Sequence, residues 1–190
     1  MLRISTVATG LAFSALFAVS SAQAASFDVY ALANSSSGGI GLDTISLTAG
    51  QSFSVSADAG DLWNAGALPR WSNADGLTGN LFATGTDDSG EPATTLIGQA
   101  FGSWAQGNLT APYGALVGQI DSGDYFLVGT SFTGTASATG TLKLYYWDSN
   151  NGDNTEFITA NVSVVPEPEG FAMMLAGLGV MGFLARRRRA

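Results

Sequence analysis

The sequence predicts an all-β domain, an antiparallel β-sandwich, between two terminal targeting segments. Polar and apolar residues alternate along 52–58, where Phe53, Val55 and Ala57 would share one face of a strand. The same alternation recurs along 141–146. Between the ends no segment keeps a helical period. A stretch of about 140 residues with this pattern is long enough for a single core between two sheets.

Strands are expected where short β-branched and aromatic runs lie between turn residues. In chain order the predicted strands are 26–32, 44–47, 52–58, 115–120, 125–129, 141–148 and 157–165. Glycine, serine and threonine predict loops at 35–41 and 84–92. The region 76–111 shows no clear strand and is interpreted as an insertion.

The N-terminus has the pattern of a secretory signal peptide, residues 1–24. Arg3 precedes an uncharged run at 7–19, and Ala22 and Ala24 flank Gln23 as a small-x-small cleavage site. The alternative is an uncleaved membrane anchor, which the short apolar run disfavours. We therefore expect a mature domain over 25–165 that has crossed the inner membrane.

The C-terminus, 166–190, has three parts. Pro166, Glu167 and Pro168 end the polar domain, and an uncharged apolar run fills 170–185. As a helix this run would be about 24 Å long, short for a hydrocarbon core of about 30 Å, although flanking arginines can snorkel. We predict a transmembrane helix there, with its end held on the cytoplasmic side by four arginines: Arg186, Arg187, Arg188 and Arg189.

This tail resembles the PEP-CTERM sorting signal of Gram-negative exopolysaccharide producers. The resemblance implies that an exosortase, a membrane transpeptidase-like enzyme, cuts near the Pro-Glu-Pro. The protein would be anchored transiently in the inner membrane and then reach the cell surface or the extracellular matrix. The alternative is a simple C-terminal tail anchor.

Composition excludes several functions for the central domain. The chain has no His and no Cys, so it lacks an imidazole base, a thiolate nucleophile and the usual zinc ligands. Without the terminal arginines and Glu169, two cations face fourteen acids, a net charge of −12. Such a domain is not expected to bind nucleic acid. The oxygen ligands that remain suit Ca²⁺.

Three ordered stretches resemble the galactophilic PA-I-type lectins of bacteria. They are 48–55 (TAGQSFSV) with 62–66 (LWNAG), 112–120 (PYGALVGQI) with 126–129 (FLVG), and 142–148 (LKLYYWD) with 150–154 (NNGDN). The resemblance implies a galactose-binding-domain-like jelly roll. It also implies one Ca²⁺ in loops at one end of the sandwich, holding two sugar hydroxyls.

Carried over residue by residue, the resemblance places Asp148, Asp153 and Asn154 as side-chain ligands, with Asp153 in place of an amide. The backbone carbonyl of Ala65 would be another ligand, and the carbonyl of Asn151 or of Gly152 a further one. The alternative is that 148–154 is a solvent-exposed turn. Galactose specificity does not carry over, because that family uses a His that this chain lacks.

Two further features have competing interpretations. The tryptophans, Trp63, Trp71, Trp104 and Trp147, either pack in the core or offer a platform for a sugar. The pair Asp87-Asp88 is interpreted as a solvated loop rather than a catalytic pair. We therefore expect no enzyme, but a surface or matrix protein with a calcium-dependent lectin-like domain associated with exopolysaccharide. The alternative is a structural protein of the same fold without a ligand.

Overall fold

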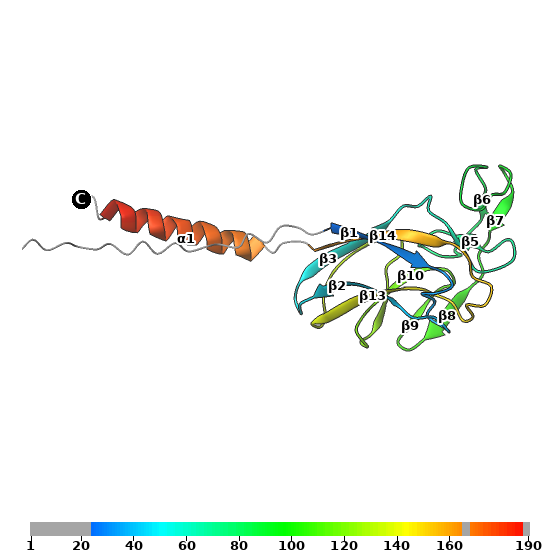
Figure 1. Cartoon of the computed structure of the whole chain (residues 1–190), viewed down its shortest axis with the longest axis horizontal. Coiled ribbons are helices and arrows are strands. Elements are labelled where there is room, and N and C mark those ends of the chain that lie inside the picture. The colour runs from blue at the N-terminus through cyan, green and yellow to red at the C-terminus, as the bar shows by residue number, and fades with distance from the viewer. Residues whose placement is uncertain (1–23, 165–167, 188–190) are drawn as a thin grey trace, which may run out of the picture. The chain divides into compact units, whose positions relative to one another are not determined.

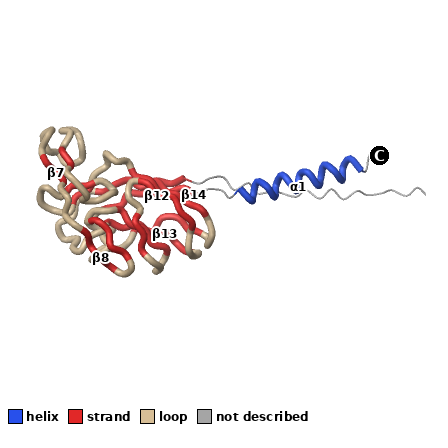
Figure 2. Tube along the Cα trace, turned by 180° about the vertical axis from the view of Figure 1, so that it is seen from behind, coloured by secondary structure: helices blue, strands red, loops and turns tan. Residues whose placement is uncertain are grey.

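A computed structural model describes residues 24–164 and 168–187 of the chain. These residues fall into two compact units, a β domain and the helix α1, and each is described by itself. Figure 1 shows the order of the elements, and Figure 2 shows that the domain consists of strands and loops.

The strands of the domain are mostly short. They are β1 (Ala24–Tyr30), β2 (Leu42–Leu47), β3 (Ser52–Ala57), β4 (Trp63–Asn64), β5 (Trp71–Ser72), β6 (Leu81–Phe82), β7 (Leu96–Gly98), β8 (Ser103–Gln106), β9 (Leu109–Pro112), β10 (Leu116–Ile120), β11 (Tyr125–Leu127), β12 (Ser131–Thr135), β13 (Gly140–Tyr146) and β14 (Phe157–Val164).

Two four-stranded antiparallel sheets form the body of the domain. One has the order β1-β14-β3-β12 and the other β11-β10-β13-β2. In the first sheet β14 lies between β1 and β3, and Ala24 at the start of β1 pairs with Ser163 near the end of β14. The first and last strands of the domain are therefore neighbours.

The two sheets share one hydrophobic cluster. Phe53 and Val55 come from β3 in the first sheet, and Leu116, Leu142 and Leu144 come from β10 and β13 in the second. Each of these side chains is at most 1% exposed. The alternation that predicts β3 thus places its apolar face on the core side, as expected for a sheet with one buried face.

The structure confirms the all-β, antiparallel prediction for the domain and contains every strand expected from the sequence, with ends shifted by at most two residues. Two expectations are wrong. The region 76–111 is not free of strands, because it holds β6, β7 and β8 and the start of β9. The short strands β4 and β5 and the edge strand β12 were not expected either. The jelly-roll topology stays a prediction.

Small hairpins bring distant loops to one end of the domain. The β4–β5 hairpin carries Asn64, which forms a bridge with Thr155 in the loop before β14, and Arg70, which forms a bridge with Gly98 at the end of β7. The β8–β9 hairpin contributes a separate hydrophobic cluster, in which Trp147 packs on Ala111 and Ala115. The loop after β13 is therefore enclosed by segments from the predicted insertion.

The helix α1 (Pro168–Arg187) begins at a proline, a residue that fits the first helical turn because no N–H is needed there. Arg186 and Arg187 lie in its last turn, where cations complement the helix dipole. Among the described segments, 24–164 and 168–187, no helix has the length and hydropathy needed to cross a membrane. The transmembrane span at 170–185 therefore stays a prediction. The predicted signal peptide, residues 1–24, lies outside the described residues apart from Ala24.

Candidate functional site

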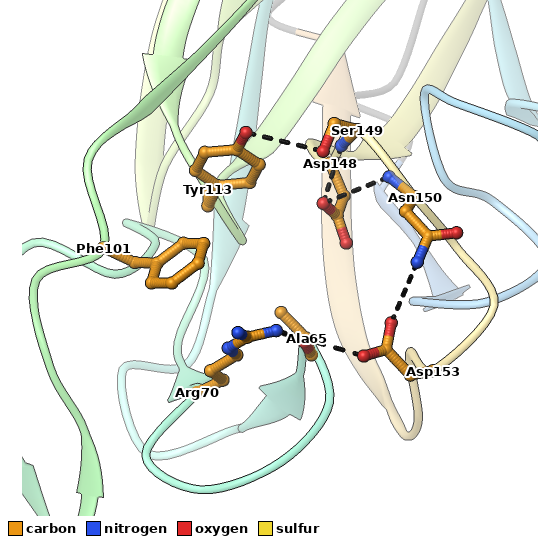
Figure 3. A pocket seen from close by; sticks show the side chains of 8 residues that line it. All are labelled: Ala65, Arg70, Phe101, Tyr113, Asp148, Ser149, Asn150 and Asp153. Carbon is orange, nitrogen blue, oxygen red and sulfur yellow. Dashed lines mark hydrogen bonds and ion pairs between the residues drawn. The ribbon is translucent and has the colours of Figure 1, made fainter.

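A pocket of about 310 Å³ opens beside the loop that follows β13 (Figure 3). Its lining residues are Ala65, Arg70, Phe101, Tyr113, Asp148, Ser149, Asn150 and Asp153. They come from the β4–β5 hairpin, from both flanks of the β8–β9 hairpin and from the 148–153 loop. The site is thus assembled from segments far apart in the sequence.

Asp148 is the most buried acidic side chain of the pocket, at 6% residue exposure. Its Oδ1 accepts hydrogen bonds from the backbone N–H groups of Ser149 (2.6 Å) and Asn150 (3.4 Å). Burial raises the pKa of Asp148, and the nearby charge of Asp153 adds to this rise. A cation in the pocket would counter both effects, because it stabilises the charged carboxylate.

Asn154 holds a buried oxygen without a hydrogen-bond partner. Its Nδ2 donates to the carbonyl of Ala31 at 3.2 Å, and its side chain lies close enough to Asp148 to act against the rise in that group's pKa. The residue is 3% exposed, and among the described residues nothing donates to its Oδ1. A buried oxygen without a hydrogen bond costs free energy. This oxygen is therefore suited to coordinate a cation or to accept a hydrogen bond from a ligand.

Asp153 lies against the backbone of Gly66. A Cβ at Gly66 would overlap the Asp153 carboxylate, and Gly66 also has a φ of +107°, which favours glycine. Asn150 Nδ2 donates to Asp153 Oδ1 at 3.4 Å. The turn after β4 therefore leaves the space in which this carboxylate faces the pocket.

Arg70 supplies the positive charge of the pocket. Its Nη1 lies 3.5 Å from the carbonyl oxygen of Ala65 and 4.0 Å from Asp153 Oδ2. The guanidinium carbon is 4.5 Å from the centre of the Phe101 ring. Figure 3 shows Arg70 and Asp153 pointing toward each other.

The structure brings together most of the predicted metal ligands. Asp148, Asp153 and Ala65 line the pocket, and Asn154 contacts Asp148 from below the surface. Asn151 does not line it: its carbonyl accepts the Asn154 N–H at 3.2 Å, and its side chain donates to Leu32. Within the described residues no group of three or more His, Cys, Asp or Glu side chains is placed to hold a metal.

The remaining oxygens nevertheless fit Ca²⁺ in kind. Two carboxylates, a buried amide oxygen without a partner and a backbone carbonyl are hard oxygen donors. The Ala65 carbonyl and Asp153 face Arg70, so a metal would have to share or replace that contact.

Sequence reasoning missed Arg70, Phe101 and Tyr113 as site residues. Arg70 was detectable in principle, because it is one of two cations in the domain. Phe101 gave no signal, since it lies in a stretch without regular pattern. Three of the tryptophans, Trp63, Trp71 and Trp147, are buried in packing positions and offer no platform, whereas Trp104 is partly exposed.

The Asp87-Asp88 pair lies in its own loop and does not line the pocket. Asp87 accepts hydrogen bonds from Thr84 and Ser89, and Asp88 Oδ2 accepts the Leu62 N–H at 2.9 Å. Both carboxylates therefore accept hydrogen bonds from backbone N–H groups, and their interpretation as a non-catalytic loop stays a prediction.

The last segment of the chain matches a known signal. Residues 164–189 are a PEP-CTERM protein-sorting motif. This confirms the resemblance seen in the tail and indicates export, membrane-anchored sorting and processing by an exosortase. Of the motif, Pro168 is the first residue of α1 and Arg186 and Arg187 are in its last turn. Pro166, Glu167, Arg188 and Arg189 lie outside the described residues.

Two further comparisons concern the whole chain. Among curated proteins, no sequence matches it. Among solved structures it is similar to the "EclA N-terminal domain; PllA-like lectin", with 20% identity, a TM-score of 0.46, and coverage of 74% of this chain and 95% of that chain.

Proposed function

We propose that this PEP-CTERM protein is displayed at the cell surface or in the matrix and binds carbohydrate through a calcium-dependent site in the pocket beside β13. The observation that carries the proposal is the convergence of Asp148, Asp153, Asn154 and the Ala65 carbonyl, from two separate segments, around one pocket. An exopolysaccharide is the ligand class that its sorting signal suggests.

Asp148, Asp153, the Asn154 Oδ1 and the Ala65 carbonyl would hold the metal. Ca²⁺ would supply a positive charge with open coordination positions for sugar hydroxyls. The chain's own contribution is rigidity, because the Ser149 and Asn150 N–H groups fix one oxygen of Asp148. Asp148 Oδ2 accepts a hydrogen bond from neither of these two N–H groups and remains for a ligand.

An aromatic wall lies beside these oxygens. Phe101 is 48% exposed, its ring centre is 5.2 Å from that of Tyr113, and Trp104 follows at 6.4 Å from Tyr113. Aromatic rings pack well against the apolar face of a sugar. Oxygen ligands next to one exposed and two partly exposed aromatic rings form a combination that suits a carbohydrate site.

A structural protein without a ligand is the second candidate. The contact of Arg70 with Asp153 and the backbone bonds to Asp148 favour it, because they partly satisfy the loop without a metal. The two candidates differ in their response to calcium.

The test is a thermal melt of the exported chain, purified in detergent, with Ca²⁺, Mg²⁺ or chelator. Ca²⁺ at a hundredfold excess over its dissociation constant should stabilise the fold by about 2.7 kcal/mol. Mg²⁺ should act much less, because it demands a tighter octahedral shell. The stabilisation and any sugar binding should disappear in Asp148→Ala with Asp153→Ala.

The matched control is Glu91→Ala with Asp124→Ala, which removes two carboxylates that do not line the pocket. This variant should respond to Ca²⁺ as the wild type does. A melting temperature indifferent to Ca²⁺ and chelator would favour the structural protein.

A further inference from the structure

We infer that Arg70 makes the pocket selective for saccharides that carry a carboxylate, such as uronates. This inference rests on the proposed function and names the ligand class of the same site.

Arg70 is held by weak contacts that leave most of its hydrogen-bonding capacity unused. A guanidinium has five N–H donors. The described residues engage only Nη1, which donates to the Ala65 carbonyl at 3.5 Å and lies 4.0 Å from Asp153 Oδ2. The side chain is 38% exposed. Its remaining donors are therefore free to meet a ligand.

Phe101 fixes the place of the guanidinium. The Arg70 guanidinium carbon lies 4.5 Å from the centre of the Phe101 ring, within cation–π distance. Phe101 in turn packs edge-on against Tyr113, at 73° between the ring planes. Because the ring supports the cation in addition to Asp153, Arg70 keeps a partner at the pocket when Asp153 is engaged elsewhere.

The metal and Arg70 would compete for the same two oxygens. Nη1 faces the Ala65 carbonyl and Asp153 Oδ2, which are two of the four groups assigned to calcium. Once those oxygens turn to a divalent cation, the guanidinium loses its nearest anion. A carboxylate on the ligand can replace it, and the planar guanidinium binds a carboxylate in a bidentate way.

The net charge of the pocket with a bound divalent cation also favours an anionic ligand. Asp148, Asp153 and Arg70 together carry one negative charge, and a divalent cation turns this into one positive charge. The rest of the domain is strongly acidic, and its other cation, Lys143, is paired with Asp43 at 3.6 Å on the β13–β2 ladder. The pocket is then the place in the described domain where an anionic saccharide finds a complementary charge.

The experiment compares uronate-containing oligosaccharides with their carboxyl-reduced neutral forms. Each pair is titrated calorimetrically into the exported chain in detergent with saturating Ca²⁺. The wild type should bind at least one uronate about tenfold more tightly than its neutral form, the size of one charged hydrogen-bonded contact. Arg70→Gln should lose this preference, and Arg70→Lys should keep part of it.

Lys143→Gln is the matched control, because it makes the same change in net charge away from the pocket, and it should keep the preference. A second measurement, calcium binding without sugar, should show about tenfold tighter binding to Arg70→Gln, since a competing cation is removed. Calcium binding by Arg70→Gln would also show that this variant is folded. Weaker calcium binding by Arg70→Gln would contradict the competition.

The outcomes separate this inference from the proposed function. Equal binding of acidic and neutral forms, or a preference that survives Arg70→Gln, overturns the inference and leaves a neutral carbohydrate site. No binding of any acidic or neutral saccharide overturns both.

Discussion

Gly66 shows how a residue without a side chain shapes the pocket. Its positive φ and the closeness of the Asp153 carboxylate both exclude a Cβ. The sequence gives no direct sign of this role, because Gly66 is one of 25 glycines in the chain.

Gly66→Ala should therefore displace Asp153. We expect a loss of about 1–2 kcal/mol from the strained backbone and, in addition, loss of the stabilisation by Ca²⁺. Gly50→Ala is the control, because Gly50 has a similar φ of +87° but open space around its Cβ position. Denaturant unfolding with and without Ca²⁺ measures both effects. An unchanged calcium response in Gly66→Ala would remove Asp153 from the ligand set.

Asp87 is a carboxylate that accepts hydrogen bonds from residues of its own loop. Hydrogen bonds from Ser89 and Thr84 lower its pKa to about 2. Since the folded pKa is depressed, the contribution of Asp87 to stability is present above its unfolded value and is lost as the pH falls through about 2.

Ser89→Ala should raise the pKa of Asp87, because the Ser89 side chain is the largest cause of the shift. An NMR titration of the carboxyl carbon measures it. Ser122→Ala, at an exposed turn that makes no contact with Asp87, should leave the midpoint unchanged. A midpoint that stays near 2 in Ser89→Ala would show that the hydrogen bonds from Thr84 and from the Ser89 N–H are sufficient.

Part of the site was predictable from single residues and part was not. Asp148 and Asp153 flank a short polar loop directly after a strand, so their proximity follows from the local sequence. Their contact with Arg70 and Phe101 depends on the β4–β5 hairpin and on the chain between β7 and β8, and no local pattern reports such long-range packing.

At the scale of the elements, the strands with one buried face were predictable and the others were not. In β3 the alternation of serines with Phe53 and Val55 indicates directly which side chains enter the core. β12 is an edge strand with a single large apolar residue, Phe132, and β6 has two residues only. Such strands form because neighbouring segments pair with them, so their own composition gives little basis for predicting them.

The aromatic contacts of β3 predict the most sensitive core position. Phe53 is 1% exposed, and its ring centre is 5.5 Å from that of Phe132 and 6.2 Å from that of Phe126. Phe53→Ala should lower the free energy of unfolding by about 3–5 kcal/mol, because it leaves a cavity between the sheets.

The control is Phe82→Ala on β6, where the side chain is 54% exposed. Its unfolding free energy should change by about 0.5 kcal/mol or less. Chemical denaturation measures both variants, and equal losses would contradict the assignment of the core.

At the scale of the whole molecule, the sorting motif decides where the domain is displayed. Replacement of Pro166, Glu167 and Pro168 by Ala should leave the protein in the inner membrane, because the apolar segment and the arginines remain while the exosortase loses its recognition site. Fractionation of the producing cells, with immunoblotting for the full-length form, measures this.

The control changes three residues of the 84–89 loop to Ala, Thr84, Thr86 and Ser89, which lie outside the motif. That protein should be processed normally. Normal release of the Pro-Glu-Pro variant would mean that another segment is read by the sorting enzyme.

The central position of β14 has a mechanical consequence. Its first residue lies next to the loop that carries Asp153 and Asn154, and its last residue, Val164, leads into the sorting motif. A pull on the chain beyond Val164 would enter the domain through this strand, which is about 27 Å long. Both of its neighbours, β1 and β3, are antiparallel to it and would be loaded in shear, so their hydrogen bonds would resist together instead of opening one at a time.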